Sequence, residues 1–230
     1  MHELLKDKSV IFFDVGYTLD YPASGDWMFT NKFLEFAGEQ MKQRSREEIR
    51  HALLTGFDYL EQNHRMQDEA EEAEQIGRFY RIVSDELGLN LSQEAIRAAA
   101  WDRTYNMDNY CIYPDVRRVL ETLSRTHRLG LISDTWSSIE NQLQTLGVRQ
   151  YFSFSTYSFA LGVFKPDHRM FLDALQKAGC AGKDAVFIDD GPRNLAGAAE
   201  LGITPILIAA NPASDVETPF AKIHALSELL

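Results

Sequence analysis

The chain has 230 residues and a formal net charge of -11, from 34 acidic and 23 basic residues. Apolar residues make up 45% of it and charged residues 25%, which is typical of a soluble globular protein with a sizeable core. A surface with this excess of acidic groups repels nucleic acid and anionic membranes, and no cluster of Lys and Arg offsets it. We therefore expect neither a nucleic-acid partner nor a membrane partner.

The first apolar segment, Val10–Phe13, is rich in β-forming residues and ends at Asp14. This pattern predicts a strand that is buried on both faces of a parallel sheet. The segment is too short for a signal peptide or a membrane span, so we expect a cytoplasmic protein. The two cysteines, Cys111 and Cys180, lie far apart and show neither metal-binding nor disulfide spacing, which fits a reducing compartment.

No strand-like pattern occurs between Trp27 and Tyr105, and the segment is predicted to be entirely helical. Ser45 and Ser92 are residues of the type that caps a helix N-terminus. The predicted helices are Trp27–Met41, Arg46–Asn63, a strongly acidic Gln67–Leu87, and Ser92–Arg103.

After Pro114 the chain alternates between strand-like and helical segments. The predicted strands are Leu129–Ile132, Tyr151–Thr156, Ala185–Ile188 and Pro205–Ile208, and the predicted helices are Asp115–Arg125, Ser137–Leu146, Asp167–Ala178 and Arg193–Leu201. Such alternation predicts right-handed crossovers and an α/β fold with a Rossmann-like parallel sheet core. Residues 1–20 supply the first strand, so the predicted core domain is 1–20 with 108–230, and 21–107 is an inserted all-helical domain.

Polar residues follow several of the predicted strands. Asp14 follows the first strand, Ser133 the second, Lys165 the third, and Asp189 and Asp190 the fourth. Because ligands bind at the carboxyl ends of strands in open parallel sheets, we expect these side chains to converge on one site.

These segments resemble, in order and position, the four motifs of the haloacid dehalogenase-like hydrolases. The family's DxDxT motif corresponds to Asp14–Thr18, its Ser or Thr at a strand end to Ser133, its lysine to Lys165, and its acidic strand end to Asp189 and Asp190. The resemblance covers nearly the whole chain, and it implies that the helical insert after the first motif is a cap domain.

The resemblance also implies roles for individual residues. Asp14 would attack phosphorus and form an aspartyl-phosphate, Ser133 would donate a hydrogen bond to a phosphoryl oxygen, and Lys165 would neutralise the developing charge. Mg²⁺ would be held by Asp14, the Gly16 carbonyl and Asp190. The expected substrate is a small phosphorylated metabolite, most simply a phosphate ester.

Three further residues are candidate contacts to the substrate. Thr18 would also help to hold the turn of the first motif, Arg193 could contact an anionic substrate, and Asn194 could orient a metal-bound water molecule. Trp136 either lines the cleft or caps a helix end, and the role of Asp134, which follows Ser133, is open.

One departure from the family concerns catalysis directly. In the family's phosphatases the second Asp of DxDxT is the general acid/base, and Gly16 occupies that position here. General acid–base catalysis contributes about 10²–10⁴-fold in rate, so hydrolysis should be slow unless another group, such as the Tyr17 hydroxyl, substitutes. Two alternatives therefore stay open. One is a dehalogenase or a phosphonate-cleaving enzyme; in the phosphonate-cleaving enzyme, Lys32 or Lys42 would form a Schiff base. The other is a catalytically weak phosphate- and metal-binding regulatory protein.

Overall fold

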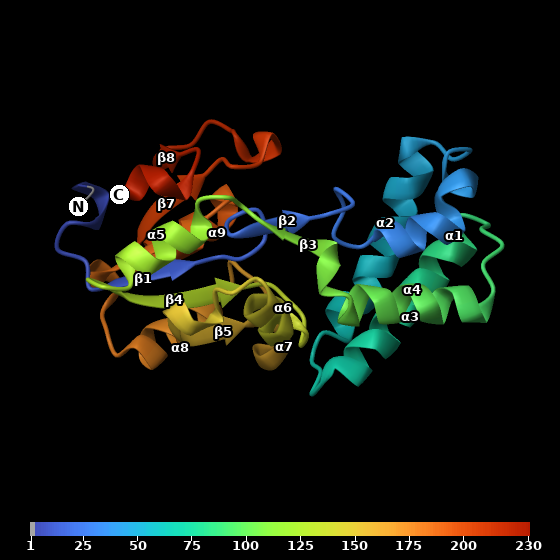
Figure 1. Ribbon diagram of the computed structural model, residues 1–230, viewed down its shortest axis with the longest axis horizontal. Helices are drawn as coiled ribbons and strands as arrows, with labels where there is room; N and C mark the ends of the chain where they lie inside the picture. Colours follow the sequence, from blue (N-terminus) through green and yellow to red (C-terminus); the bar gives the residue numbers. More distant parts are fainter. Residues whose placement is uncertain (1–2) are drawn as a thin grey trace. The chain divides into compact units, whose positions relative to one another are not determined.

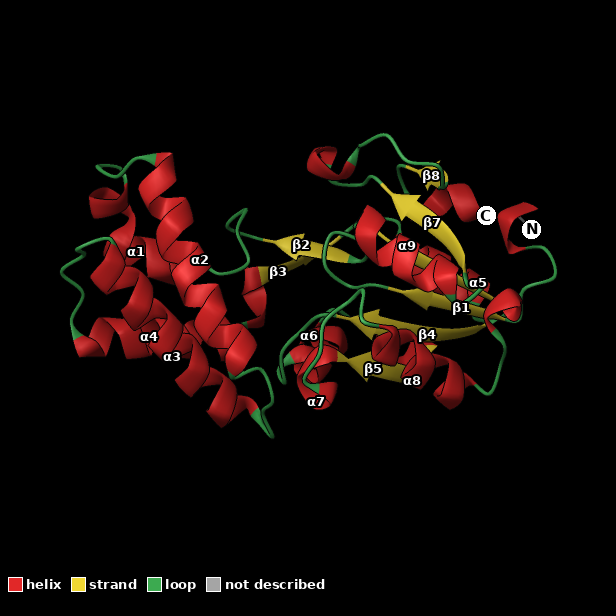
Figure 2. Ribbon diagram, turned by 180° about the vertical axis from the view of Figure 1, so that it is seen from behind, coloured by secondary structure: helices red, strands yellow, loops and turns green. Residues whose placement is uncertain are grey.

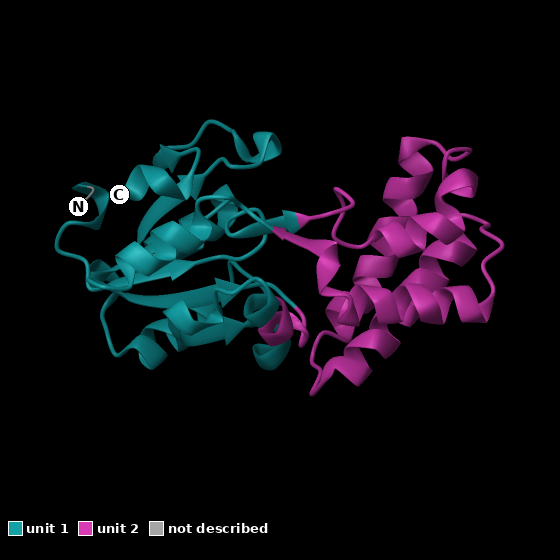
Figure 3. Ribbon diagram, in the orientation of Figure 1, with its two compact units in different colours: residues 1–21, 112–135, 143–230 teal, residues 22–111, 136–142 magenta. Residues whose placement is uncertain are grey.

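The computed structural model describes residues 3–230, which form two compact units (Figure 3). The sheet unit contains the residues up to Tyr21 together with 112–135 and 143–230, and the helical unit contains 22–111 and 136–142. The sequence predicts domain boundaries after residues 20 and 107, close to two of these. Segment 136–142 differs, because the prediction places it in the core domain and the structure places it in the helical unit.

The sheet unit is built on six parallel strands in the order β5-β4-β1-β6-β7-β8 (Figures 1 and 2). The strands are β1 (Val10–Phe13), β4 (Arg128–Ser133), β5 (Phe152–Tyr157), β6 (Ala185–Asp189), β7 (Thr204–Ile208) and β8 (Ala221–Ile223). All four residues of β1 are buried, because β1 lies between β4 and β6 and both sheet faces are covered. The predicted Rossmann-like parallel sheet is confirmed.

Helices cover both faces of this sheet, as expected for right-handed crossovers. Helix α5 lies on one face, and α8 and α9 lie on the other, where α8 packs on β4 and β5, and α9 on β6 and β7 (Figures 1 and 2). The helices in the part of the chain after residue 112 are α5 (Val116–Leu123), α6 (Ile139–Thr145), α7 (Ser158–Leu161), α8 (His168–Ala178) and α9 (Pro192–Glu200). Short 3-10 turns are Glu3–Leu5, Met107–Asn109, Arg149–Tyr151, Gly182–Asp184, Pro212–Ser214 and Leu226–Leu229.

The sequence did not predict four short elements. Strand β8 adds a sixth strand at the sheet edge, and α7 is a single turn inserted between β5 and Lys165. Strands β2 (Asp20–Pro22) and β3 (Tyr110–Ile112) form a separate two-stranded sheet. Segments of three or four residues are too short to show a hydrophobic period, which is why pattern analysis does not find them.

The helical unit contains α1 (Asn31–Met41), α2 (Arg46–Gln62), α3 (Glu69–Glu86) and α4 (Gln93–Tyr105). Helix α1 begins later than the predicted Trp27, because the Asp26 carboxylate accepts the backbone N–H groups of Met28 and Phe29 in a turn that precedes the N-cap, Thr30. The predicted N-caps Ser45 and Ser92 both accept a backbone N–H in the first helical turn. Among residues 3–230, no helix is long and apolar enough to cross a membrane.

Segment 136–142 belongs to the helical unit. The Trp136 ring contacts the hydrophobic core of the helical unit and meets the His64 ring edge-on, with the ring centroids 5.0 Å apart. Trp136 is half-buried against the apolar core of the helical unit, and its predicted roles at the cleft or at a helix end stay predictions.

His64 is buried at 3% exposure, and burial lowers its pKa from 6.5 to about 4. Between pH 6.5 and about 4, His64 is therefore protonated in the unfolded chain but neutral in the folded chain. The free energy of unfolding should fall as the pH decreases through this window. The loss should be at most about 3 kcal/mol. Urea unfolding at pH 7 and pH 5 measures it, and His64→Phe, which keeps an aromatic ring beside Trp136, should have a flatter pH profile. Equal slopes in the two proteins would contradict the assignment.

Candidate active site

Asp14, Lys165 and Asp189 form a buried, hydrogen-bonded group at the carboxyl edge of the sheet. Asp14 directly follows β1 and Asp189 ends β6, and the Asp14 N–H donates to the Ile188 carbonyl at 2.9 Å. The Lys165 ammonium donates to Asp14 Oδ1 at 2.6 Å and to Asp189 Oδ2 at 2.7 Å. It also lies over the Phe187 ring, 5.4 Å from the centroid. Residues from three distant segments thus meet, as the strand ends predict.

Charge balance in this group is incomplete. Burial raises the pKa of Asp14 well above its usual value, and the positive charge of Lys165 opposes that rise. Burial alone would lower the pKa of Lys165, but the carboxylates of Asp14 and Asp189 raise it, so the ammonium keeps its proton. Asp190 is half-buried, and burial followed by repulsion from Asp189 raises its pKa. Two carboxyl groups therefore share one ammonium group, and Asp190 adds further negative charge beside Asp189.

Asp189 is a buried residue that binds Lys165, and it is not exposed as a metal ligand would be. Its side chain is fully buried, and it accepts the Gly191 N–H at 2.6 Å and the Asn194 side-chain amide at 3.1 Å in addition to Lys165. Asn194 therefore helps to orient Asp189, and its predicted roles toward the substrate and a metal-bound water molecule stay predictions.

Asp190 and Asp134 are held by partners that the sequence did not indicate. The Ser214 hydroxyl, from a 3-10 turn after β7, donates to Asp190 Oδ2 at 2.8 Å. Asp134 Oδ1 accepts the backbone N–H of Lys165 at 2.9 Å, so the residue after Ser133 fixes the loop that carries the lysine. Each of these contacts joins residues that lie far apart in the sequence, so no local sequence pattern predicts it.

Ser133 and Thr18 have different surroundings. Ser133 ends β4 and is 2% exposed, next to the strand end that carries Asp14. Thr18 is fully buried, and its Oγ1 atom has no hydrogen-bond partner within residues 3–230. It lines a pocket of about 150 Å³ with Tyr113, Asp115 and other residues of the sheet unit, and its role as a substrate contact stays a prediction.

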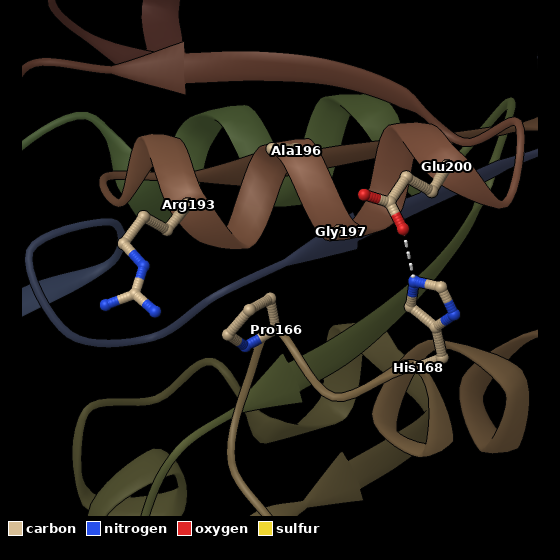
Figure 4. A pocket seen from close by; sticks show the side chains of 6 residues that line it. All are labelled: Pro166, His168, Arg193, Ala196, Gly197 and Glu200. Atoms are coloured by element: carbon tan, nitrogen blue, oxygen red, sulfur yellow. Dashed lines mark hydrogen bonds and ion pairs between the residues drawn. The ribbon is translucent and has the colours of Figure 1, made fainter.

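Arg193 lies on the exposed side of α9 and lines a pocket of about 260 Å³ with Pro166 and the ion-paired His168 and Glu200 (Figure 4). Close packing behind this pocket depends on Gly197, where an added Cβ would lie 2.7 Å from the Pro166 Cβ. The approach of Pro166 to α9 fixes the chain beside Lys165. None of the contacts described for Asp14, Lys165 and Asp189 involves Arg193, so its role as a substrate contact stays a prediction.

The turn of the first motif carries backbone strain at Tyr17. The Val15 carbonyl accepts the N–H groups of Thr18 and Leu19, at 3.1 and 2.7 Å, and Gly16 forms a bridge with Asp20. Tyr17 has φ 55°, in the left-handed region that glycine adopts without cost. The resembling family usually has glycine at this position, and the structure shows the conformation that this glycine suits.

Tyr17→Gly should give a more stable protein than Tyr17→Ala, by about 1 kcal/mol. Both changes remove the ring, so the comparison isolates the strain that a Cβ introduces at φ 55°. Urea unfolding of the two variants measures the difference. Two variants of equal stability would show that the backbone at this position relaxes without cost.

The oxygen groups at this edge suit a hard divalent cation. Asp14 and Asp190 are carboxylates, the Gly16 carbonyl belongs to the same turn, and a cation would offset the unbalanced negative charge. Within residues 3–230, no group of three or more His, Cys, Asp or Glu side chains is arranged as a metal site, so a cation here would need the carbonyl and water as further ligands.

Residues 10–202 match the family model of the haloacid dehalogenase-like hydrolases. The structure is similar to a HAD phosphatase from Thermococcus onnurineus, with 20% identity, a TM-score of 0.64, and coverage of 96% of this chain and 95% of that one. It is similar to a 2-haloacid dehalogenase from Pseudomonas syringae pv. Tomato DC3000, with 23% identity, a TM-score of 0.64, and coverage of 96% of each chain. The magnesium-bound HAD-hydrolase YfnB from Bacillus subtilis has 13% identity, a TM-score of 0.68, and coverage of 96% of each chain. With the family model spanning most of its length, the chain belongs to the haloacid dehalogenase-like hydrolases.

Proposed function

We propose that the protein is a Mg²⁺-dependent hydrolase of small phosphorylated metabolites that acts through an aspartyl-phosphate on Asp14. The observation that carries the proposal is the placement of Asp14 beside a buried, protonated Lys165, with Asp190 held at the same edge by Ser214. This arrangement offers one nucleophilic oxygen together with positive charge for a phosphoryl group. Mg²⁺, when bound by Asp14, the Gly16 carbonyl and Asp190, would neutralise negative charge on the phosphate and the nucleophile.

The chain's own residues perform the remaining work. An Asp14 oxygen attacks phosphorus as the bond to the ester oxygen breaks, and water later cleaves the acyl-phosphate to release inorganic phosphate and restore the carboxylate. Lys165 stabilises negative charge on the transferring group, and the Ser133 hydroxyl donates to a phosphoryl oxygen. We further propose that the helical unit is a cap that excludes water and selects the substrate.

The leaving alcohol needs a proton that Gly16 cannot supply. Esters whose leaving group is already a weak base depend little on that proton, so aryl phosphates should be cleaved faster than alkyl phosphates. A panel of phosphate esters, assayed for phosphate release with Mg²⁺ and with a chelator, tests the proposal. Release that needs Mg²⁺ and falls with increasing leaving-group basicity supports it, and no release from any ester contradicts it.

Gly16 also keeps a dehalogenase in consideration, because members of that branch lack the second Asp. Release of halide from a short 2-haloacid, unaffected by chelator, would favour it. The phosphonate-cleaving alternative gains no support: Lys32 and Lys42 are ion-paired with Glu35 and Glu39 on the surface of the helical unit, with 36% and 73% of their side chains exposed. A Schiff-base lysine needs a desolvated amine. If no bond is cleaved, restoration of turnover by Gly16→Asp would identify a binding or regulatory protein.

A further inference from the structure

Glu72 is a fully buried acid on α3 and has no part in the active site described above. Its carboxylate is used entirely within the helical unit. Oε2 accepts the Ser137 hydroxyl at 3.0 Å and the Ser138 backbone N–H at 2.7 Å, and Oε1 accepts the Ser138 hydroxyl at 2.8 Å. One buried side chain thus holds two consecutive residues of segment 136–142.

The positive charge that balances Glu72 belongs to Arg103 on α4. Its Nη1 lies 3.6 Å from Glu72 Oε1 and donates to the Tyr110 hydroxyl at 2.6 Å, while its Nε donates to the Trp27 carbonyl at 2.9 Å. A buried carboxylate destabilises a protein unless its charge is paired and its oxygens accept hydrogen bonds. The fold is therefore more stable when Ser137 and Ser138 stay bound to Glu72.

Two more contacts tie the same segment to the helices. The Trp136 ring packs against His64, and the Asn141 side-chain amide donates to Glu69 Oε1 at 3.0 Å. Segment 136–142 is therefore bound to the helical unit at its start, in its middle and near its end.

The residue just before this segment is bound to the sheet unit instead. The Thr135 N–H donates to the Ser158 hydroxyl at 2.8 Å, and that hydroxyl donates to the Thr135 carbonyl at 3.2 Å. Ser133 pairs with Tyr157 in the sheet. A single residue, Trp136, separates the anchor on the sheet unit from the anchor on the helical unit.

We propose that Glu72 is a positioning residue for Ser133 and the loop after it. By holding Ser137 and Ser138, it restrains the C-terminal end of the loop from Ser133 to Thr135. Asp134 in this loop binds the Lys165 N–H, so the coupling extends to the lysine. The inference rests on the proposed function only for what Ser133 and Lys165 do; the coupling itself does not require it.

Hydrogen exchange of the full chain, measured by mass spectrometry, tests the coupling without substrate. Glu72→Gln should increase exchange about tenfold for amides within residues 133–138, because a charge-assisted hydrogen bond is weakened. Ser84→Ala is the matched control: it removes a buried hydrogen bond on the same helix, from the Ser84 hydroxyl to the Leu89 carbonyl at 3.0 Å, and should leave exchange in residues 133–138 unchanged. Ser138→Ala should act like Glu72→Gln, with a smaller effect, and serves if Glu72→Gln does not fold.

The proposal is supported if exchange is faster throughout residues 133–138 in Glu72→Gln and in Ser138→Ala but not in the control. Faster exchange limited to 136–138 overturns the link to Ser133. Exchange in 133–138 that is as fast in Ser84→Ala as in Glu72→Gln shows general loosening and overturns the link too. If phosphate release is observed, KM for the ester should also rise about tenfold in Glu72→Gln and stay within about twofold in Ser84→Ala. Absence of release from the unaltered protein would count against the proposed function, and the exchange result would still decide the coupling.

Discussion

Asp14→Asn should lower phosphate release by roughly four orders of magnitude or more. An amide oxygen is too weak a nucleophile to form the phosphoryl bond, whereas the fold should persist because Asn can still accept the Lys165 hydrogen bond now made to Asp14 Oδ1. Phosphate release under single-turnover conditions gives the rate, and mass spectrometry after acid quenching detects a phosphorylated protein.

Asp173→Asn is the matched control for this change. Asp173 is a carboxylate on α8 that binds Thr156 and Lys177, and it has no contact with Asp14 or Lys165 among those described. It should retain release within about twofold, as expected for a site away from the chemistry. Full release by Asp14→Asn would remove Asp14 as the nucleophile, and a phosphorylated adduct that persists in that variant would do the same.

Lys165→Met should lower the free energy of unfolding by about 3–5 kcal/mol, because two buried carboxylates lose their common partner. The midpoint and slope of urea unfolding give the change. Lys177→Met is the control: its ion pair with Asp173 is 2.7 Å long but 44% exposed on the lysine side, so its loss should cost less than about 1 kcal/mol.

A second substitution separates charge from packing in Lys165→Met. Adding Asp14→Asn removes one of the two unpaired carboxylates, so the double variant should recover part of the lost stability. If the two effects simply add, the lysine contributes through packing against Phe187, and the electrostatic account of the site is wrong.

The sequence predicted the parts of the fold that have a local signal. Val10–Phe13 and Ala185–Ile188 are continuous apolar runs, and each forms a buried central strand. Strand β8 has the sequence Ala-Lys-Ile and has no such signal, because it exists only through pairing with β7. The start of α1 was misplaced because the Asp26 turn competes with the helix for the same N–H groups.

The same distinction applies to the active site. Asp14, Ser133 and Asp189 lie at strand ends, so parallel topology alone brings them to one edge. Ser214 and Glu72 could not be found in this way: each binds a residue far away in sequence, and nothing in its own neighbourhood marks it. The packing of 136–142 could not be predicted for the same reason, since its partner Glu72 lies far away on α3.

The central position of β1 has a consequence for how the chain folds. Val10 is made early in synthesis, but its sheet partners are Arg128 and Ala185, so the sheet cannot close until most of the chain has emerged. Helices α1 to α4 form from local contacts in the meantime. Folding should therefore have a fast helical phase and a slower phase limited by long-range strand pairing, and until the second phase the apolar Val10–Phe13 run is exposed to aggregation. Substitutions in β1 should affect yield during expression more than substitutions in α2.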